Sequence, residues 1–199
     1  MRPAQIFDNT LLYRLSQAPF VVDKLRPLLR GEDLGRARRV LDVGCGPGTN
    51  APFFTHAEYL GLDLSPAYVA HARARFRGRF LAADAAAFSL EGEAPFDFVL
   101  LNSLLHHLDD AQVRAVLARV APLVAPGGAV HVLDLVLPRR PGLAWALARL
   151  DRGAHPRPHE RWLALLGERL EPLHLERYEV GALGRPLWHM LYLKGAVRP

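Results

Sequence analysis

Residues 38–49 read RRVLDVGCGPGT, an apolar run that ends in three glycines at alternate positions. The apolar run predicts a strand that is buried on both faces, as in a parallel sheet. Gly44, Gly46 and Gly48 allow positive φ angles, so the backbone can turn sharply off the strand and a ligand can approach its main-chain atoms. An ordinary loop between a strand and a helix is the alternative, because glycine-rich turns are common.

A second apolar run, EYLGLDLS at residues 58–65, contains an acidic residue near its end. This residue, Asp63, follows Gly44 by nineteen positions. An acid at the tip of the second strand is placed to accept hydrogen bonds from the two hydroxyls of a ribose. The two features together predict a ribose-binding site, with capping of a surface helix as the alternative role for Asp63.

The glycine loop, Asp63 and several later motifs resemble the class I S-adenosylmethionine-dependent methyltransferases over residues 38–194. Thr49 stands where the dinucleotide fingerprint G-x-G-x-x-G has its third glycine. A dinucleotide needs the amides and dipole of a helix N-terminus for its pyrophosphate, whereas S-adenosylmethionine has no phosphate. The spacing therefore favours a methyl donor over a nicotinamide cofactor. The resemblance implies S-adenosylmethionine as cofactor and S-adenosylhomocysteine as product.

Apolar runs alternate with helical patterns along the chain, which indicates parallel βαβ units. We expect strands at 38–43, 59–62, 79–84, 96–102 and 129–138, followed by two terminal strands at 173–180 and 186–195. Helices are expected between them at 49–56, 66–76 and 111–124. With the resemblance, this pattern predicts an α/β fold: a Rossmann-like, seven-stranded, mostly parallel sheet with helices on both faces, an antiparallel terminal hairpin and N-terminal cover helices.

The chain is expected to have two parts. Residues 1–35 would form an N-terminal helical cover, and residues 36–199 a methyltransferase domain with a helical insertion at about 139–170. The resemblance implies that the cover folds over the donor as a lid, in which case Tyr13 and Arg14 would face the donor. Helices that only cover the edge of the sheet are the alternative.

The resemblance also implies a role for each residue of the donor site. Asp42, at the end of the first strand, would anchor the amino group of the donor, partly through water, or else fix the loop backbone. Asp63 would bind the ribose, and Asp84 would accept a hydrogen bond from the adenine amino group. The other expected contacts come from the glycine loop and from the residues at the ends of strands: Gly44, Cys45, Gly46, Leu64, Ala85 and Asn102.

The stretch LLNSLLHHLDD at residues 100–110 resembles the strand-four motif of small-molecule methyltransferases, in which a histidine follows a short apolar run. His107 and His106 are both candidates for a base that deprotonates the acceptor, because imidazole titrates near neutral pH. Bracing of the loop by hydrogen bonds is the alternative. The stretch does not read as the N-P-P-Y type of loop that grips a flipped base, which argues against methylation of nucleic-acid amino groups.

Two further observations concern the acceptor side. Metal-dependent relatives have an Asp-Asn pair after the fifth strand, whereas Asp134 is followed by Leu135, so we expect no metal. The late polar stretch that holds His155, His159 and Glu160 corresponds to the region that lines the acceptor pocket in the family.

Composition limits the partners. The net charge is +5, and nearly all of the basic residues are arginines. A solvated arginine surface explains this balance better than a nucleic-acid groove, although residues 73–79 would attract an acidic partner. Cys45 is the only cysteine, so an internal disulfide is excluded and a packing role is expected. The absence of an apolar run of about 18–20 residues and of a signal-peptide pattern predicts a cytoplasmic protein without a membrane partner.

The sequence thus predicts S-adenosylmethionine-dependent methyl transfer, an SN2 displacement, to an oxygen or nitrogen of a small molecule. The enzyme is expected to be a monomer or a homodimer. One alternative is a methyltransferase that acts on RNA or protein. Another is a non-catalytic protein that only binds S-adenosylmethionine.

Overall fold

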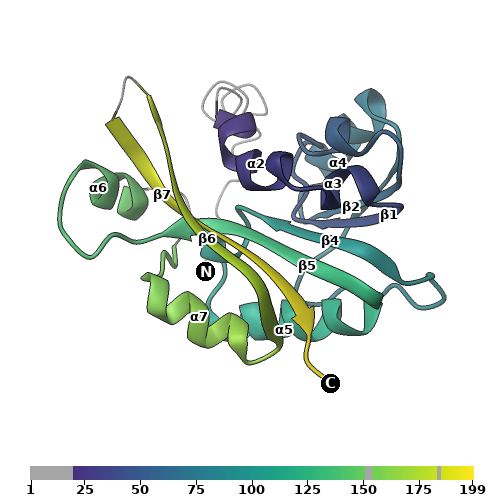
Figure 1. Ribbon diagram of the computed structural model, residues 1–199. Coiled ribbons are helices and arrows are strands. Elements are labelled where there is room, and N and C mark those ends of the chain that lie inside the picture. Colours follow the sequence, from purple (N-terminus) through teal and green to yellow (C-terminus); the bar gives the residue numbers. More distant parts are fainter. Residues whose placement is uncertain (1–19, 151–153, 183–184) are drawn as a thin grey trace, which may run out of the picture.

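The computed structural model describes residues 20–150, 154–182 and 185–199 (Figure 1). Their strands form one seven-stranded sheet in the order β3-β2-β1-β4-β5-β7-β6. The strands are β1 Arg39–Val43, β2 Glu58–Asp63, β3 Arg79–Ala82, β4 Phe96–Asn102, β5 Val124–Val136, β6 Leu170–Ala182 and β7 Arg185–Val197. Neighbours among β1 to β5 pair in parallel, and β7 runs antiparallel to both β5 and β6. The predicted fold class is confirmed.

Helices cover both faces of this sheet. They are α2 Val21–Arg30, α3 Asp33–Arg36, α4 Pro66–Arg75, α5 Asp110–Val120, α6 Leu143–Leu150 and α7 His159–Gly167, with 3-10 turns at η2 Ala51–Phe54, η3 Leu105–His107 and η4 Ala121–Leu123. In the view of Figure 1, α2, α3 and α4 lie above the sheet, and α5 and α7 lie below it. No helix of the described segments is long and apolar enough to cross a membrane.

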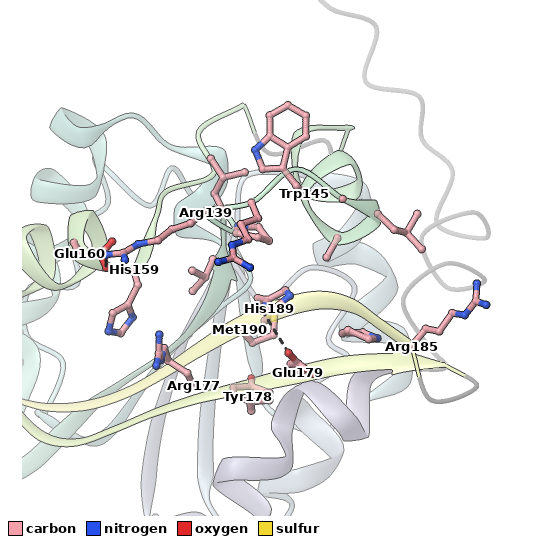
Figure 2. A pocket seen from close by; sticks show the side chains of 18 residues that line it. Arg139, Trp145, His159, Glu160, Arg177, Tyr178, Glu179, Arg185, His189 and Met190 are labelled. Carbon is pink, nitrogen blue, oxygen red and sulfur yellow. Dashed lines mark hydrogen bonds and ion pairs between the residues drawn. The ribbon is translucent and has the colours of Figure 1, made fainter.

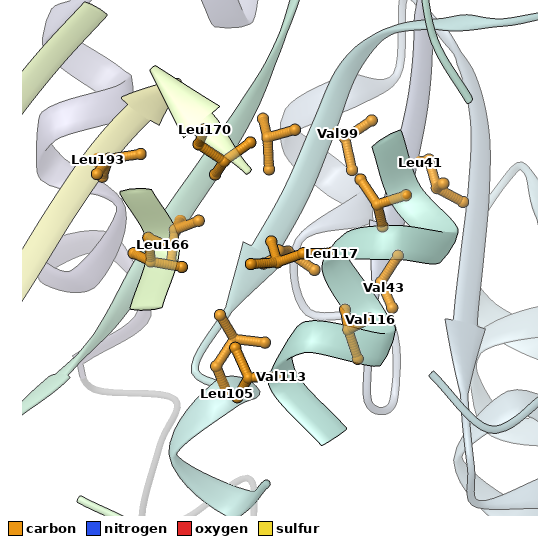
Figure 3. Packing of buried hydrophobic residues seen from close by; sticks show 14 of the residues in the cluster. Leu41, Val43, Val99, Leu105, Val113, Val116, Leu117, Leu166, Leu170 and Leu193 are labelled. Carbon is orange, nitrogen blue, oxygen red and sulfur yellow. The ribbon is translucent and has the colours of Figure 1, made fainter. Parts of the chain in front are cut away.

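Alternation along the strands builds one core on each face. Leu41 and Val43 of β1 point to the face of α5 and α7, where they join Val99, Leu117 and their neighbours (Figure 3). The other face packs against α2, η2 and α4, and Leu25 and Leu28 of α2 are buried there. The residue between Leu41 and Val43 is the buried Asp42. It therefore lies on the opposite side of β1 from Leu41 and Val43.

Capping residues explain where two of the helices start. The Ser65 side chain accepts a hydrogen bond from the Tyr68 amide at 3.3 Å, and Pro66 occupies the first turn of α4. Asp109 and Gln112 form a reciprocal capping box at the start of α5. Both starts agree with the sequence patterns.

The structure corrects the expected helix at 49–56. Only the short 3-10 turn η2 forms there, closed by the Phe53 amide donating to the Asn50 carbonyl oxygen at 3.1 Å. Pro52 has no amide hydrogen, and hydrogen bonds between residues three apart favour a short, tight turn.

Three other boundaries differ from expectation. The short helix α3, which follows Gly31, was not expected. The strand expected to reach Asp84 ends at Ala82, because the amides of Ala87 and Phe88 turn back to the Asp84 carbonyl oxygen. Residues 125–128, which lie between the expected helix and the expected strand, belong to β5, but the pairing of β5 with β4 shifts register there and Gly127 has a φ of +78°. The expected first N-terminal helix, with Tyr13 and Arg14, lies outside the described residues.

The strand order places a crevice at the carboxyl end of the sheet. From β1 the chain proceeds through β2 to β3 on one side, whereas β4 and β5 follow on the other side. At such a reversal the loops after β1 and β4 turn to opposite faces, and ligands of open α/β sheets bind there. The glycine loop after β1 and the histidine segment after β4 both start at this point.

Candidate functional site

The glycine loop is held in a conformation that only its glycines adopt without strain. Gly44, Gly46 and Gly48 have φ angles of +79°, +55° and +85°. The amides of Gly44 and Cys45 donate to the Leu62 carbonyl oxygen at 2.7 and 2.9 Å, which ties the loop to β2. A Cβ atom on Gly44 would come within 2.8 Å of the Leu104 side chain. The loop therefore fits closely between β2 and the segment that follows β4.

Asp63 joins this loop to the end of β2. Its Oδ2 atom accepts a hydrogen bond from the Gly46 amide at 2.8 Å, and its Oδ1 atom accepts one from the Ser65 amide at 2.9 Å. Burial raises the pKa of the carboxyl group, and the two amides oppose that shift. A carboxylate can accept about four hydrogen bonds. These amides occupy two positions and hold the carboxylate in place at the strand tip.

A buried polar chain runs beneath the loop. The Asp42 side chain is fully buried, and its Oδ2 atom accepts hydrogen bonds from the Tyr59 hydroxyl and from Asn50 Nδ2, the latter at 3.0 Å. Asn50 Oδ1 in turn accepts one from Asn102 Nδ2 at 3.1 Å. Among the described residues the Asp42 Oδ1 atom has no hydrogen-bond partner. Burial raises the pKa of Asp42 to about 6, against the effect of the Tyr59 and Asn50 hydrogen bonds.

Three of the predicted adenine contacts lie at the same edge of the sheet. Leu64, next to Asp63, leaves 67% of its surface exposed although it is apolar. Asp84 is exposed two residues beyond β3, the strand that pairs with β2. Its Oδ1 atom accepts a hydrogen bond from the Ala86 amide at 2.8 Å, and Ala85 lies within that turn. The carboxylate of Asp84 therefore also caps its own loop.

The two histidines of the predicted acceptor segment have different surroundings. His106 is buried, and its Nδ1 atom lies 2.6 Å from Asp134 Oδ1. His107 is exposed, and its ring centroid lies 4.1 Å from that of His106. Asp134, which the sequence suggested only as a possible metal ligand, is thus the partner of His106. The described residues contain no cluster of three or more histidine, cysteine or acidic side chains that would hold a metal ion.

Asp134 also fixes the backbone of the segment. It accepts hydrogen bonds from the amides of Leu105 at 2.8 Å and Leu135 at 2.7 Å. Burial opposes ionisation of this carboxyl group, but His106 and the two amides outweigh it and keep its pKa below the ordinary value. The 3-10 turn η3 is therefore anchored to β5 by a carboxylate.

Arg157 holds the same segment from the other side and was not predicted. It is 5% exposed, and its guanidinium donates to the carbonyl oxygens of Leu105 at 3.1 Å and Leu108 at 2.6 Å. Its Nε atom donates to Asp110 Oδ1 at 2.7 Å. An arginine in a polar, proline-rich stretch gives no sequence signal for burial, because its partners lie about fifty residues earlier.

A cavity of about 980 Å³ opens farther along this edge (Figure 2). Its walls come from the end of β5, from α6 and the start of α7, and from the ends of β6 and β7 that form the hairpin. The predicted acceptor-side residues His159 and Glu160 line it, as does Trp145, whereas His155 does not. No residue of the glycine loop lines it, so the cavity and the loop are separate features of one sheet edge.

Residues 40–128 match the family model described as a methyltransferase domain. This part of the chain is therefore similar to methyltransferase domains. Trans-aconitate 2-methyltransferase of Methylobacterium radiotolerans is 40% identical over 121 residues, which are 57% of this chain and 45% of that protein. The chain spans about half the length of the curated relatives it matches.

Two solved structures share the fold of this chain. N-methyltransferase NodS from Bradyrhizobium japonicum WM9, in complex with S-adenosyl-L-homocysteine, superposes with a TM-score of 0.73 at 21% identity, over 96% of this chain and 94% of NodS. Human N-acetylserotonin methyltransferase in complex with SAM superposes with a TM-score of 0.70 at 20% identity, over 93% of this chain and 55% of that protein. The class I methyltransferase fold therefore extends beyond the matched residues, through the terminal hairpin.

All of the predicted donor-site residues and both histidines lie within the matched residues 40–128. The structure joins Gly46 directly to Asp63, and it joins Asp42 to Asn102 through Asn50. Sequence reasoning missed Asn50, Tyr59 and Arg157. Asn50 directly follows the glycine loop, and this position was the one sequence signal that could have marked it as part of the site.

Substitution of Arg157 by methionine should lower the free energy of unfolding by about 2–3 kcal/mol, because several buried acceptors lose their donor. Urea denaturation measures this loss. Arg161→Met is the matched control, since Arg161 binds the same carboxylate of Asp110 from an exposed position. That control should cost less than about 1 kcal/mol. Equal losses for the two variants would contradict the role assigned to Arg157.

Proposed function

We propose that this methyltransferase domain binds S-adenosylmethionine and transfers its methyl group to an oxygen or nitrogen of a small molecule. The observation that carries the proposal is Asp63, held at the tip of β2 by the Gly46 and Ser65 amides beside the glycine loop. That carboxylate has acceptor positions for both hydroxyls of a ribose. The match to a methyltransferase domain and the structural likeness to proteins that hold S-adenosyl-L-homocysteine or SAM support the same conclusion.

The remaining donor contacts fit the chemistry of the molecule. The Asp42 Oδ1 atom, which has no hydrogen-bond partner in the described part of the chain, suits the donor's ammonium group, reached directly or through water. Exposed Leu64 offers an apolar surface to the adenine ring, with Asp84 and Ala85 at its edge. We assign the main chain of Gly44, Cys45 and Gly46 to the contact with the methionine part. Asn102, bonded to Asn50, forms the wall toward the acceptor.

When bound, S-adenosylmethionine supplies a methyl carbon on a positively charged sulfur: a lone pair of the acceptor forms the new bond, the carbon–sulfur electron pair returns to sulfur, and S-adenosylhomocysteine leaves. The protein then has two tasks, to align the reactants and to remove the acceptor's proton where there is one. The glycine loop and Asp63 hold the donor. We assign proton removal to His107, which is exposed on the segment after β4.

His106 is assigned a positioning role. Because its Nδ1 atom is bonded to Asp134, the imidazole is fixed in one orientation. Its ring packs against that of His107 at a centroid distance of 4.1 Å. The buried pair of His106 and Asp134 thereby sets where the exposed imidazole of His107 lies.

A small-molecule acceptor is favoured over RNA or protein by the names of the relatives, which include trans-aconitate 2-methyltransferase and an N-acetylserotonin methyltransferase. A protein that only binds the donor would lack turnover with every acceptor. A cytoplasmic location and a monomeric or homodimeric state stay predictions.

Asp63→Ala should weaken binding of S-adenosylmethionine by on the order of a hundredfold, because two hydrogen bonds to a charged acceptor are lost. Isothermal titration calorimetry on the full chain measures the change. Glu171→Gln, an exposed acidic residue on β6, is the control and should alter affinity less than about twofold. An unchanged affinity in Asp63→Ala would mean that the ribose lies elsewhere.

Affinity for S-adenosylmethionine should rise between about pH 5 and pH 7.5, because Asp42 must be ionised to hold an ammonium group and its pKa is about 6. In the absence of donor, the raised pKa of Asp42 makes the free energy of unfolding fall as pH rises. The contribution of Asp42 to stability is greatest at low pH and is lost as pH rises through about 6. Titrations at several pH values should give a shallower affinity profile for Asp42→Asn than for the wild type. Superimposable profiles would refute the ammonium contact.

His107→Ala should lower kcat by about a hundredfold while affinity for the donor stays within about twofold. Its rate should also lose the rise with pH that a general base gives the wild type. His106→Asn, the positioning variant, should shift the pH of that rise instead of abolishing it. Unchanged turnover and an unchanged pH profile in His107→Ala would remove the base assignment.

A further inference from the structure

The cavity of about 980 Å³ begins close to the histidine segment. It is lined by Val136 at the end of β5, two residues after Asp134, the partner of His106. The Leu137 amide, also on the cavity wall, donates to the Arg157 carbonyl oxygen at 2.8 Å, and Arg157 holds Leu105 and Leu108. Two structural links therefore relate the cavity to the histidine segment: the strand β5 from Val136 to Asp134, and the hydrogen bond from Leu137 to Arg157.

The charged residues around the cavity are mainly cationic. Four arginines line it, with two glutamates: Arg139, Arg140, Arg177, Arg185, Glu160 and Glu179. Arg139 is paired with Glu160, and Glu179 lies 3.6 Å from His189 Nδ1 (Figure 2). Among the described residues, Arg140, Arg177 and Arg185 have no carboxylate within ion-pairing distance. Three guanidinium groups thus stand on the cavity walls without an acidic partner in the described chain.

His159 gives a second, independent indication of a polar ligand. Its Nδ1 atom is buried and has no hydrogen-bond partner among the described residues. Burial lowers the pKa of this imidazole, and the positive charges of Arg177 and Arg139 lower it further. A buried ring nitrogen without a partner costs free energy unless a ligand or water satisfies it.

The floor of the cavity is apolar. Met190 is 2% exposed, Val136 and Tyr178 are each 7% exposed, and Trp145 and Pro186 complete the surface. Such a floor with polar groups at the walls is typical of sites for small organic molecules. Arginine binds planar or tetrahedral anions through two parallel hydrogen bonds.

We propose that this cavity is the acceptor pocket and that the acceptor is an anionic small molecule, whose carboxylate or phosphate is bound by Arg140 and Arg177. The inference rests on the proposed methyl transfer and adds the chemical class of the acceptor. Arg139, already neutralised by Glu160, lines the same cavity. The carbon skeleton of the acceptor packs on Met190 and Tyr178.

The test uses the full chain saturated with S-adenosylhomocysteine and titrated with matched probes. These are trans-aconitate against its neutral trimethyl ester, and glycerol 3-phosphate against glycerol. At least one anion should bind about tenfold or more tightly than its neutral partner, and added salt should weaken it. The pair that shows the difference identifies the anion as carboxylate or phosphate.

Arg177→Gln and Arg140→Gln should each lower the affinity for that anion by about tenfold. The affinity for S-adenosylhomocysteine should stay within about twofold of the wild-type value. Arg77→Gln, an exposed arginine before β3 at the opposite end of the sheet, is the matched control and should change neither affinity. Arg77, Arg140 and Arg177 are all exposed, so the variants should fold, which thermal unfolding checks.

Two failures are distinguishable. A chain that binds S-adenosylhomocysteine but binds anions no better than their neutral partners, or equally well without Arg140 and Arg177, would overturn this inference alone. A chain that does not bind S-adenosylhomocysteine would overturn the proposed function and with it the acceptor role of the cavity.

Discussion

The hydrogen bonds of Asp63 to the Gly46 and Ser65 amides are the contacts on which the proposed donor site depends. They join the end of β2 to the glycine loop, while the Leu62 carbonyl oxygen holds the start of that loop. The loop can follow this path because its glycines adopt positive φ angles. A single carboxylate therefore both shapes the loop and presents acceptor positions at its surface.

Two more buried carboxylates organise the rest of the sheet edge in the same way. Asp42 holds Asn50 and, through it, Asn102 at the end of β4. Asp134 on β5 holds the segment that carries the two histidines, and Arg157 clamps it from the opposite side. Each carboxylate receives several donors, which is what makes burial of an acid tolerable. Acids on β2, β1 and β5 thus fix the proposed donor side and the histidine segment through separate sets of hydrogen bonds.

The parts that were predictable from sequence are those encoded by local patterns. Apolar runs predicted the strands, and the helical patterns between them predicted helices that begin near residues 66 and 111. The spacing from Gly44 to Asp63 pointed to two features that lie together in the proposed donor site. In place of the helix expected after the loop, only a 3-10 turn forms, because the segment is short and Pro52 has no amide hydrogen to donate.

The contacts that sequence reasoning missed link residues far apart in the chain. Tyr59 meets Asp42 across neighbouring strands, and Arg157 meets a segment about fifty residues away. The assignment of Asp134 shows the same limit. The sequence suggested it only as a metal ligand to be rejected, because nothing local marks it as the partner of His106 across β4 and β5.

The central claim is that the loop and Asp63 together hold the adenosyl part of the methyl donor. A crystal structure of the full chain with S-adenosylhomocysteine tests this most directly. We expect both ribose hydroxyl oxygens within about 2.5–3.0 Å of the Asp63 carboxylate, with the adenine ring on Leu64. Density for the ribose at any other strand end, or in the arginine-lined cavity, would contradict the account.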